Sequence, residues 1–121
     1  MNVTRLNGAL TLCAAALVLN PADAAAWQVL ASQGARHFVA VGAGQAHETV
    51  LRQAAASVCR ANEACVVMFW ADEGLAATRM PLTAAQSAAQ VAQYTRNPAT
   101  GHEELLLRCQ AGIDPSARCL E

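Results

Sequence analysis

Four of the five cysteines constrain the fold of this chain more than any other feature. They stand at Cys59, Cys65, Cys109 and Cys119, whereas Cys13 lies in an N-terminal apolar run. An even set of cysteines in a small chain destined for an oxidising compartment predicts two disulfides. Each pair that is close in sequence flanks a polar, turn-like stretch. We therefore expect Cys59–Cys65 and Cys109–Cys119, although four cysteines allow three connectivities.

A zinc site or a redox dithiol is the alternative use of these thiols. Zinc sites usually contain cysteines separated by two to four residues, and redox pairs are separated by two. Here five residues separate Cys59 from Cys65, and nine separate Cys109 from Cys119. Structural disulfides are favoured.

The first 26 residues have the three zones of a secretory signal peptide. A short polar start with Arg5 precedes an apolar run of 12 residues, 8–19, and residues 20–26 are small and turn-prone, with Ala-x-Ala at Ala22/Ala24 and Ala24/Ala26. The apolar run is shorter than the roughly 20 residues of a membrane-spanning helix. We predict a cleaved signal peptide over residues 1–26 and a periplasmic or secreted product.

The remaining residues, 27–121, contain no linker or repeat, so we expect a single domain. The whole chain has 8 Arg plus Lys and 9 Asp plus Glu; losing Arg5 and Asp23 leaves seven and eight, a net charge of −1. Nucleic acids and anionic membranes bind a clustered basic excess, which is missing here. There is no lysine for Schiff-base or P-loop chemistry. We expect no cofactor and no membrane association after cleavage.

Periodicity and turn signals predict an α+β domain. A capping box, Thr83 with Gln86, starts the second helix, and Asn97-Pro98 ends it. The expected order is β-α-β-β-α-β, which is the ferredoxin-like signature, with an additional N-terminal strand or arm. The expected ranges are an N-terminal strand or arm at 27–32, strands at 37–41, 65–70, 75–80 and 105–109, and helices at 45–60 and from 83 to the stop at 96–101.

The strand Val66–Trp70 is apolar on both faces, which fits poorly with a ferredoxin-like edge strand. Either the Trp27 segment, a second copy or a partner covers it, or the strand order differs. Self-association through this strand is therefore one hypothesis.

Catalytic and metal-binding patterns are incomplete. Gly42-x-Gly44 lacks the third glycine of a dinucleotide loop, because position 47 is His47. His47-Glu48 and His102-Glu103 could contribute to a metal or acid/base site, but neither continues as H-E-x-x-H. We predict no metal site, and keep His47, Glu48 and His102 as an alternative.

The segment Tyr94-x-Arg96-Asn97-Pro98-x-Thr100-Gly101 combines residue types that are enriched in recognition surfaces. Arg96 could bind a carboxylate. We take Tyr94, Arg96, Asn97 and Thr100 as candidate binding residues, against the alternative of a helix stop and turn. Trp70 is a further candidate, with burial in the core as its alternative.

Three stretches together, C-x5-C-V-V-M-F-W, M-P-L-T-x-A-Q and Y-x-R-N-P-x-T-G, resemble those of small uncharacterised exported proteins of Gram-negative bacteria. The resemblance covers residues 39–109. It implies a compartment and a recurring fold, but transfers no activity and no catalytic residues.

These patterns favour a non-catalytic interaction module, an accessory or inhibitor of another envelope protein. The alternative is a small periplasmic enzyme or metal-dependent binder that uses His47, Glu48 and His102.

Overall fold

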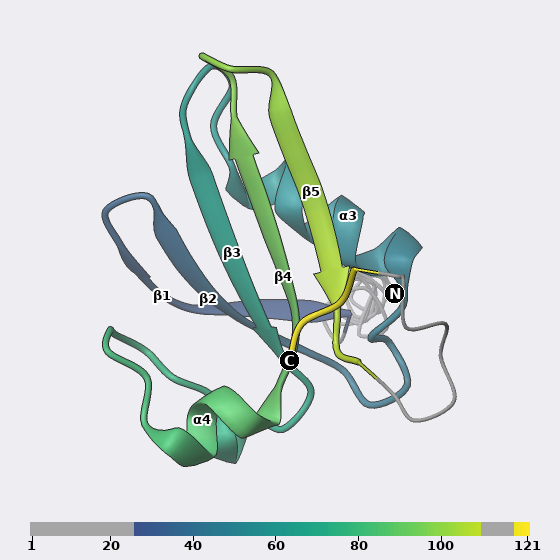
Figure 1. Cartoon of the computed structure of the whole chain (residues 1–121). Helices are drawn as coiled ribbons and strands as arrows, with labels where there is room; N and C mark the ends of the chain where they lie inside the picture. Colours follow the sequence, from purple (N-terminus) through teal and green to yellow (C-terminus); the bar gives the residue numbers. More distant parts are fainter. Residues whose placement is uncertain (1–25, 110–117) are drawn as a thin grey trace, which may run out of the picture.

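Five strands lie in one sheet in the order in which they follow one another along the chain, β1-β2-β3-β4-β5 (Figure 1). The computed structural model describes residues 26–109 and 118–121, so the predicted signal peptide lies outside the described residues except for Ala26. The elements are β1 (Trp27–Gln33), β2 (Arg36–Val41), α3 (Glu48–Val58), β3 (Cys65–Trp70), the 3-10 turn η1 (Glu73–Leu75), α4 (Ala84–Ala89), β4 (Gln90–Asn97) and β5 (His102–Leu107).

The predicted α+β class is confirmed. Neighbouring strands are antiparallel except β2 and β3, which are parallel. A parallel pair needs a crossover connection, and α3 supplies it. The antiparallel pairs β1–β2 and β4–β5 are joined by short turns.

The predicted β-α-β-β-α-β order is not the one observed, because two elements differ. Residues 75–80 form the end of η1 and irregular backbone instead of a strand. The second helix begins at its capping box as predicted but ends at Ala89, and β4 follows at once. The apolar residues Val91 and Ala92 fit a helical stripe and a strand equally well, and the pairing of β4 with β3 decides between them.

The helix α3 covers one face of the sheet, here called the α3 face (Figure 1). Its buried residues are Val50, Leu51, Ala54 and Ala55. They belong to a core that also contains Val39, Val67 and Phe69 from β2 and β3 and Ala92 and Tyr94 from β4. The amphipathic period of α3 predicted from the sequence therefore marks the side that packs on the sheet.

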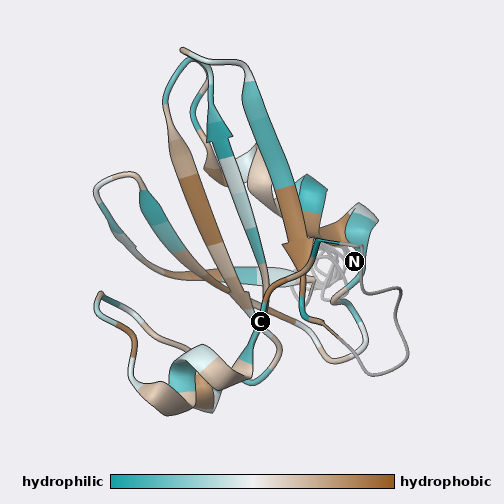
Figure 2. Ribbon diagram, viewed as in Figure 1, coloured by the Kyte–Doolittle hydropathy of each residue, from teal (hydrophilic) through white to brown (hydrophobic). Residues whose placement is uncertain are grey.

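The opposite face is covered by residues 71–89, here called the covering segment, which contains η1 and α4 (Figure 2). Phe38, Met68 and Trp70 are buried there with Ala77 of the covering segment, and Met80, Leu82 and Ala89 pack around them. This explains the two-faced apolar strand: β3 is the central strand of the sheet, and each face has its own cover.

The strand Val66–Trp70, through which self-association was predicted, is central in this sheet. β3 pairs with β2 on one side and β4 on the other, and residues 67–70 are buried. Neither an edge nor a face of this strand is free over those residues. The sequence revealed the burial, but not the strand order that produces it.

Both predicted disulfides are confirmed. Cys59–Cys65 joins the end of α3 to the start of β3, and Cys109–Cys119 joins the end of β5 to the C-terminus. The second disulfide lies beside Leu120, which forms a parallel bridge with Arg108. The backbone N–H of Leu120 donates to the carbonyl of Leu107 at 2.7 Å, so the C-terminus lies against the end of β5.

Candidate functional site

The predicted binding segment Tyr94–Thr100 is the end of β4 and its turn into β5, not the stop of a helix. Asn97 Oδ1 accepts a hydrogen bond from the Ala99 N–H at 3.1 Å, and the Thr100 N–H donates to the Asn97 carbonyl at 3.2 Å. Gly101 has a φ of 77° and completes the turn. Asn97 and Thr100 therefore have a local role in shaping this hairpin.

Tyr94 and Arg96 lie under the α3 face. Tyr94 is buried and its hydroxyl donates to Glu103 Oε2 at 2.5 Å. Burial raises the pKa of Tyr94, and the hydrogen bond to Glu103 raises it further. The Arg96 Nη2 donates to the backbone carbonyl of Arg60 at 2.7 Å. Both side chains are thus engaged inside the domain.

Trp70 lies in the core, the alternative that the sequence left open. Its side chain is fully buried, and its indole N–H donates to the carbonyl of Gln86 at 2.8 Å. A ligand at the surface cannot contact it without opening the covering segment.

His47, Glu48 and His102 do not converge. His47 stands at the N-cap position of α3 without a side-chain capping hydrogen bond, and Glu48 forms an ion pair with Arg52 at 2.9 Å. His102 begins β5 beside Asn97, at the end of the sheet where α3 finishes and β3 begins. The length of α3, about 16 Å at 1.5 Å per residue, separates the two ends. Within residues 26–109 and 118–121 no group of three or more His, Cys, Asp or Glu side chains could hold a metal ion.

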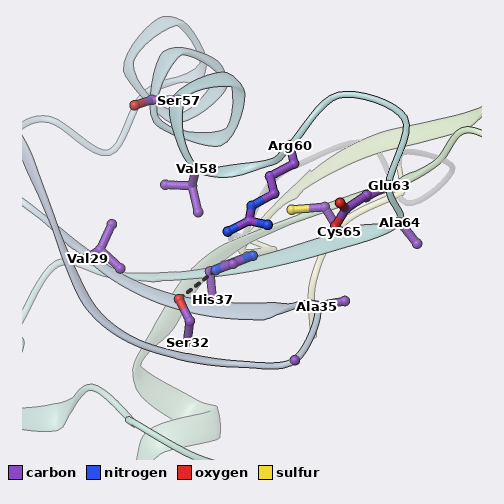
Figure 3. A pocket seen from close by; sticks show the side chains of 11 residues that line it. Val29, Ser32, Ala35, His37, Ser57, Val58, Arg60, Glu63, Ala64 and Cys65 are labelled. Carbon is purple, nitrogen blue, oxygen red and sulfur yellow. Dashed lines mark hydrogen bonds between the residues drawn. The ribbon is translucent and has the colours of Figure 1, made fainter.

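A cleft of about 520 Å³, here called the β1 cleft, lies between the β1–β2 hairpin and the end of α3 (Figure 3). The sequence did not predict it. The hairpin contributes Val29, Ser32, Gly34, Ala35 and His37; α3 and the loop to β3 contribute Ser57, Val58, Arg60, Glu63, Ala64 and Cys65. The Cys59–Cys65 disulfide joins the two ends of this loop and so fixes it to the sheet.

Ser32 and His37 face each other across the hairpin on the α3 face. The Ser32 hydroxyl and His37 Nδ1 are 2.7 Å apart. Partial burial lowers the pKa of His37, and the positive charge of Arg60 lowers it further. Both effects favour the neutral ring.

The β1 cleft has an apolar half and a charged half. Val29, 45% exposed, and Val58 line the first. In the second, the Arg60 guanidinium points toward the His37 ring (Figure 3). Glu63 is the acidic side chain that lines the cleft.

The strand β1 forms one edge of the sheet, beside the β1 cleft. Its sequence, WQVLASQ, contains no charged residue and no proline. At the other edge, β5 begins with His102, Glu103 and Glu104, and Leu120 pairs near its end. Charges and covered backbone commonly protect sheet edges from pairing. Of the two edge strands, β1 is the one that lacks charges along its whole length, with a bulge between Val29 and Ala31 as its protective feature.

One sequence signal could have revealed this site. Gly34 and Ala35 form a two-residue connection between the paired residues Gln33 and Arg36, and Gly34 has a φ of 62°. Glycine at the first position of such a loop is typical of a type II′ hairpin. The hairpin places β1 at the edge and brings Ser32 opposite His37.

No family model, curated protein or solved structure matches this chain. Among the described residues, no helix has the length and apolar character that crossing a membrane requires. The two disulfides are typical of a domain in an oxidising compartment.

Proposed function

We propose that this chain is an exported, non-catalytic interaction domain that pairs its edge strand β1 with an extended segment of another envelope protein. The observation that carries the proposal is the uncharged edge of β1, which borders the β1 cleft. Addition of a strand to a sheet edge gives affinity through main-chain hydrogen bonds, while pockets beside the edge select side chains. A role as accessory or inhibitor of the bound protein follows from such binding.

Export is supported by two independent features. The N-terminal residues have the zones of a signal peptide, and cleavage after Ala24 or Ala26 removes Cys13. The four remaining cysteines form two disulfides. The resemblance to exported proteins of Gram-negative bacteria agrees with a periplasmic or secreted domain, residues 27–121.

A non-catalytic role is supported by the geometry of the polar side chains. Ser32 and His37 form a hydrogen-bonded pair, but no hydrogen bond or ion pair links His37 to an orienting carboxylate among the described residues. His47 and His102 lie at opposite ends of α3. The metal-dependent alternative therefore has no converging set of side chains among the described residues.

The proposal is tested by affinity capture from periplasmic extract with three forms of the oxidised domain. The first is the wild type, and the second is Leu30→Pro. Leu30 lies at the bulge and has no paired residue in β2, so proline there changes the edge strand at a position outside the registered pairs and removes one of its N–H groups. The third is Arg79→Gln, an exposed change in the covering segment.

A partner bound by the wild type and by Arg79→Gln, but lost from Leu30→Pro, is the expected result. Circular dichroism in the near-ultraviolet checks that all three forms are folded. A partner retained equally by Leu30→Pro would overturn docking at β1. If only the domain itself is captured, and light scattering shows a dimer, the segment that pairs with β1 belongs to a second copy and not to another envelope protein.

A further inference from the structure

We infer that the β1 cleft selects an extended partner segment with an apolar side chain and, two residues away, a carboxylate. This inference rests on the proposed pairing of a partner strand with β1, and it adds the chemistry of the residues that are selected.

The β1 cleft lies on the α3 face of the sheet. Val29 pairs with Val39, which belongs to the core under α3, and Ser32 pairs with His37, two residues before Val39. Side chains alternate between faces along a strand. A strand added beside β1 would therefore direct every second side chain to the α3 face, where the β1 cleft is.

The two halves of the β1 cleft have the spacing of residues i and i+2 in a strand. Val29 and Ser32 are three residues apart in sequence, but the bulge between Val29 and Ala31 takes up one of them. Their partners in β2, Val39 and His37, are two residues apart, or about 6.6 Å along a strand. Residues i and i+2 of an extended partner have the same separation.

The apolar half of the β1 cleft defines the first side chain. Val29 exposes 45% of its surface at the sheet edge, and Val58 lines the same cleft from the last turn of α3. A branched or aromatic side chain laid between them would remove apolar surface from water on both walls.

The charged half defines the second side chain. Arg60 forms none of the ion pairs recorded among the described residues, and its guanidinium points toward His37 (Figure 3). Its backbone is fixed, because the Arg60 carbonyl accepts from both Arg96 Nη2 at 2.7 Å and the Glu63 N–H at 3.3 Å. A guanidinium binds a carboxylate through two parallel hydrogen bonds.

The other polar side chains that line the cleft with Arg60 and His37 are Ser32, Ser57 and Glu63. Ser32 already bonds to His37 Nδ1. Glu63 forms no ion pair with Arg60 among the described residues, so the guanidinium is open to a partner's carboxylate at short range. A lysine or arginine in the partner would instead meet Arg60 and be repelled.

The probe is a blocked nine-residue peptide, acetyl-Ser-Thr-Glu-Thr-Ile-Thr-Glu-Thr-Ser-amide. Its sequence reads the same in both directions, so the peptide presents the same side chains to the β1 cleft whether it pairs with β1 parallel or antiparallel. One control peptide has both Glu residues replaced by Gln. A second control has the same composition, with Ile moved by one position so that it faces away from the cleft. Binding to the oxidised domain is followed by nuclear magnetic resonance of the β1 amides and the His37 ring.

We expect the Glu peptide to bind roughly fivefold more tightly than the Gln peptide, since Arg60 forms an ion pair with a carboxylate but only a charged–neutral hydrogen bond with an amide. Arg60→Gln should remove this difference, and Arg79→Gln should retain it. The peptide with the displaced Ile should bind the wild-type domain more weakly than the Glu peptide and the Gln peptide do. The His37 ring signals should move toward those of the protonated form when the Glu peptide binds.

Two failures are distinguishable. Equal binding of the Glu and Gln peptides, with shifts at the β1 amides, overturns the carboxylate selection and retains docking at β1. A Glu peptide that shifts no β1 amide at millimolar concentration, or that binds Leu30→Pro as well as wild type, overturns the pairing with β1 itself.

Discussion

The indole N–H of Trp70 donates a hydrogen bond to the backbone carbonyl of Gln86, 2.8 Å away, and so joins the central strand to the start of α4. Trp70 is fully buried, while Gln86 lies in the segment that covers the face opposite α3. This bond is one of the few polar contacts between the covering segment and the sheet. A second is the bond from the Met80 N–H to Gln33 Oε1 at 3.0 Å.

Replacing Trp70 by Phe should destabilise the domain. The change removes the hydrogen bond to Gln86 and leaves a small cavity, so we expect a loss of about 2 kcal/mol in the free energy of unfolding. Urea denaturation measures it. Trp27→Phe is the matched control because Trp27 is only partly buried, and it should cost less. A loss for Trp70→Phe no larger than for Trp27→Phe would contradict the assignment.

Replacing Arg96 by Gln should loosen the loop that carries Arg60. The bond from Arg96 Nη2 to the Arg60 carbonyl is lost, and we expect the free energy of unfolding to fall by about 1–2 kcal/mol. Hydrogen exchange at the Glu63 amide, which bonds to the same carbonyl, should accelerate. Arg79→Gln should change neither quantity. Unaltered exchange at Glu63 would show that Arg96 does not position this loop.

Lowering the pH should destabilise the domain through His37. Partial burial, and then the charge of Arg60, holds the pKa of His37 below its ordinary value of 6.5. The unfolded chain therefore binds a proton at a higher pH than the folded domain, and the free energy of unfolding falls as the pH drops through about 6.5. The fall ends when folded His37 is protonated as well.

His37→Gln should reduce this part of the pH dependence, measured by urea denaturation at several pH values. His47→Gln is the control, since His47 is exposed at the start of α3. A titration of the His37 ring by nuclear magnetic resonance gives the sign directly. A pKa above 6.5 in the folded domain would reverse the prediction.

Removing the Cys109–Cys119 disulfide with paired Ala substitutions should release the C-terminus from β5. The Leu120 N–H, which donates to the Leu107 carbonyl at 2.7 Å, should then exchange with solvent at least tenfold faster. Paired Ala substitutions at Cys59 and Cys65 should instead lower the free energy of unfolding by about 2 kcal/mol. Unchanged exchange at Leu120 in the first variant would mean that pairing alone holds the C-terminus.

The sequence predicted those features that depend on local chemistry. The disulfide pairs, the capping box at Thr83 and the apolar side of α3 all follow from residues a few positions apart. The fate of residues 90–97 depended instead on a distant partner, because Val91 and Ala92 satisfy a helical and a strand period alike. Pairing with β3 supplied the information that the local pattern lacked.

The site was less predictable for the same reason. Arg60, His37 and Val29 belong to three separate elements, and their meeting depends on the parallel pairing of β2 with β3 and on the β1–β2 hairpin. Tyr94 and Arg96 drew attention through residue type, yet their polar groups bond to Glu103 and to the backbone of Arg60. Residue type alone does not distinguish a side chain that binds a ligand from one that supports its neighbours.

The unequal edges of the sheet also set how many neighbours this domain can have. Charges stand at the start of β5 and Leu120 pairs beyond its end, whereas β1 is uncharged along its length. Under the proposed pairing, the described strands therefore offer one receptive edge per domain, and binding of one partner strand would end the assembly at two components. A domain with two receptive edges could instead propagate into a fibre.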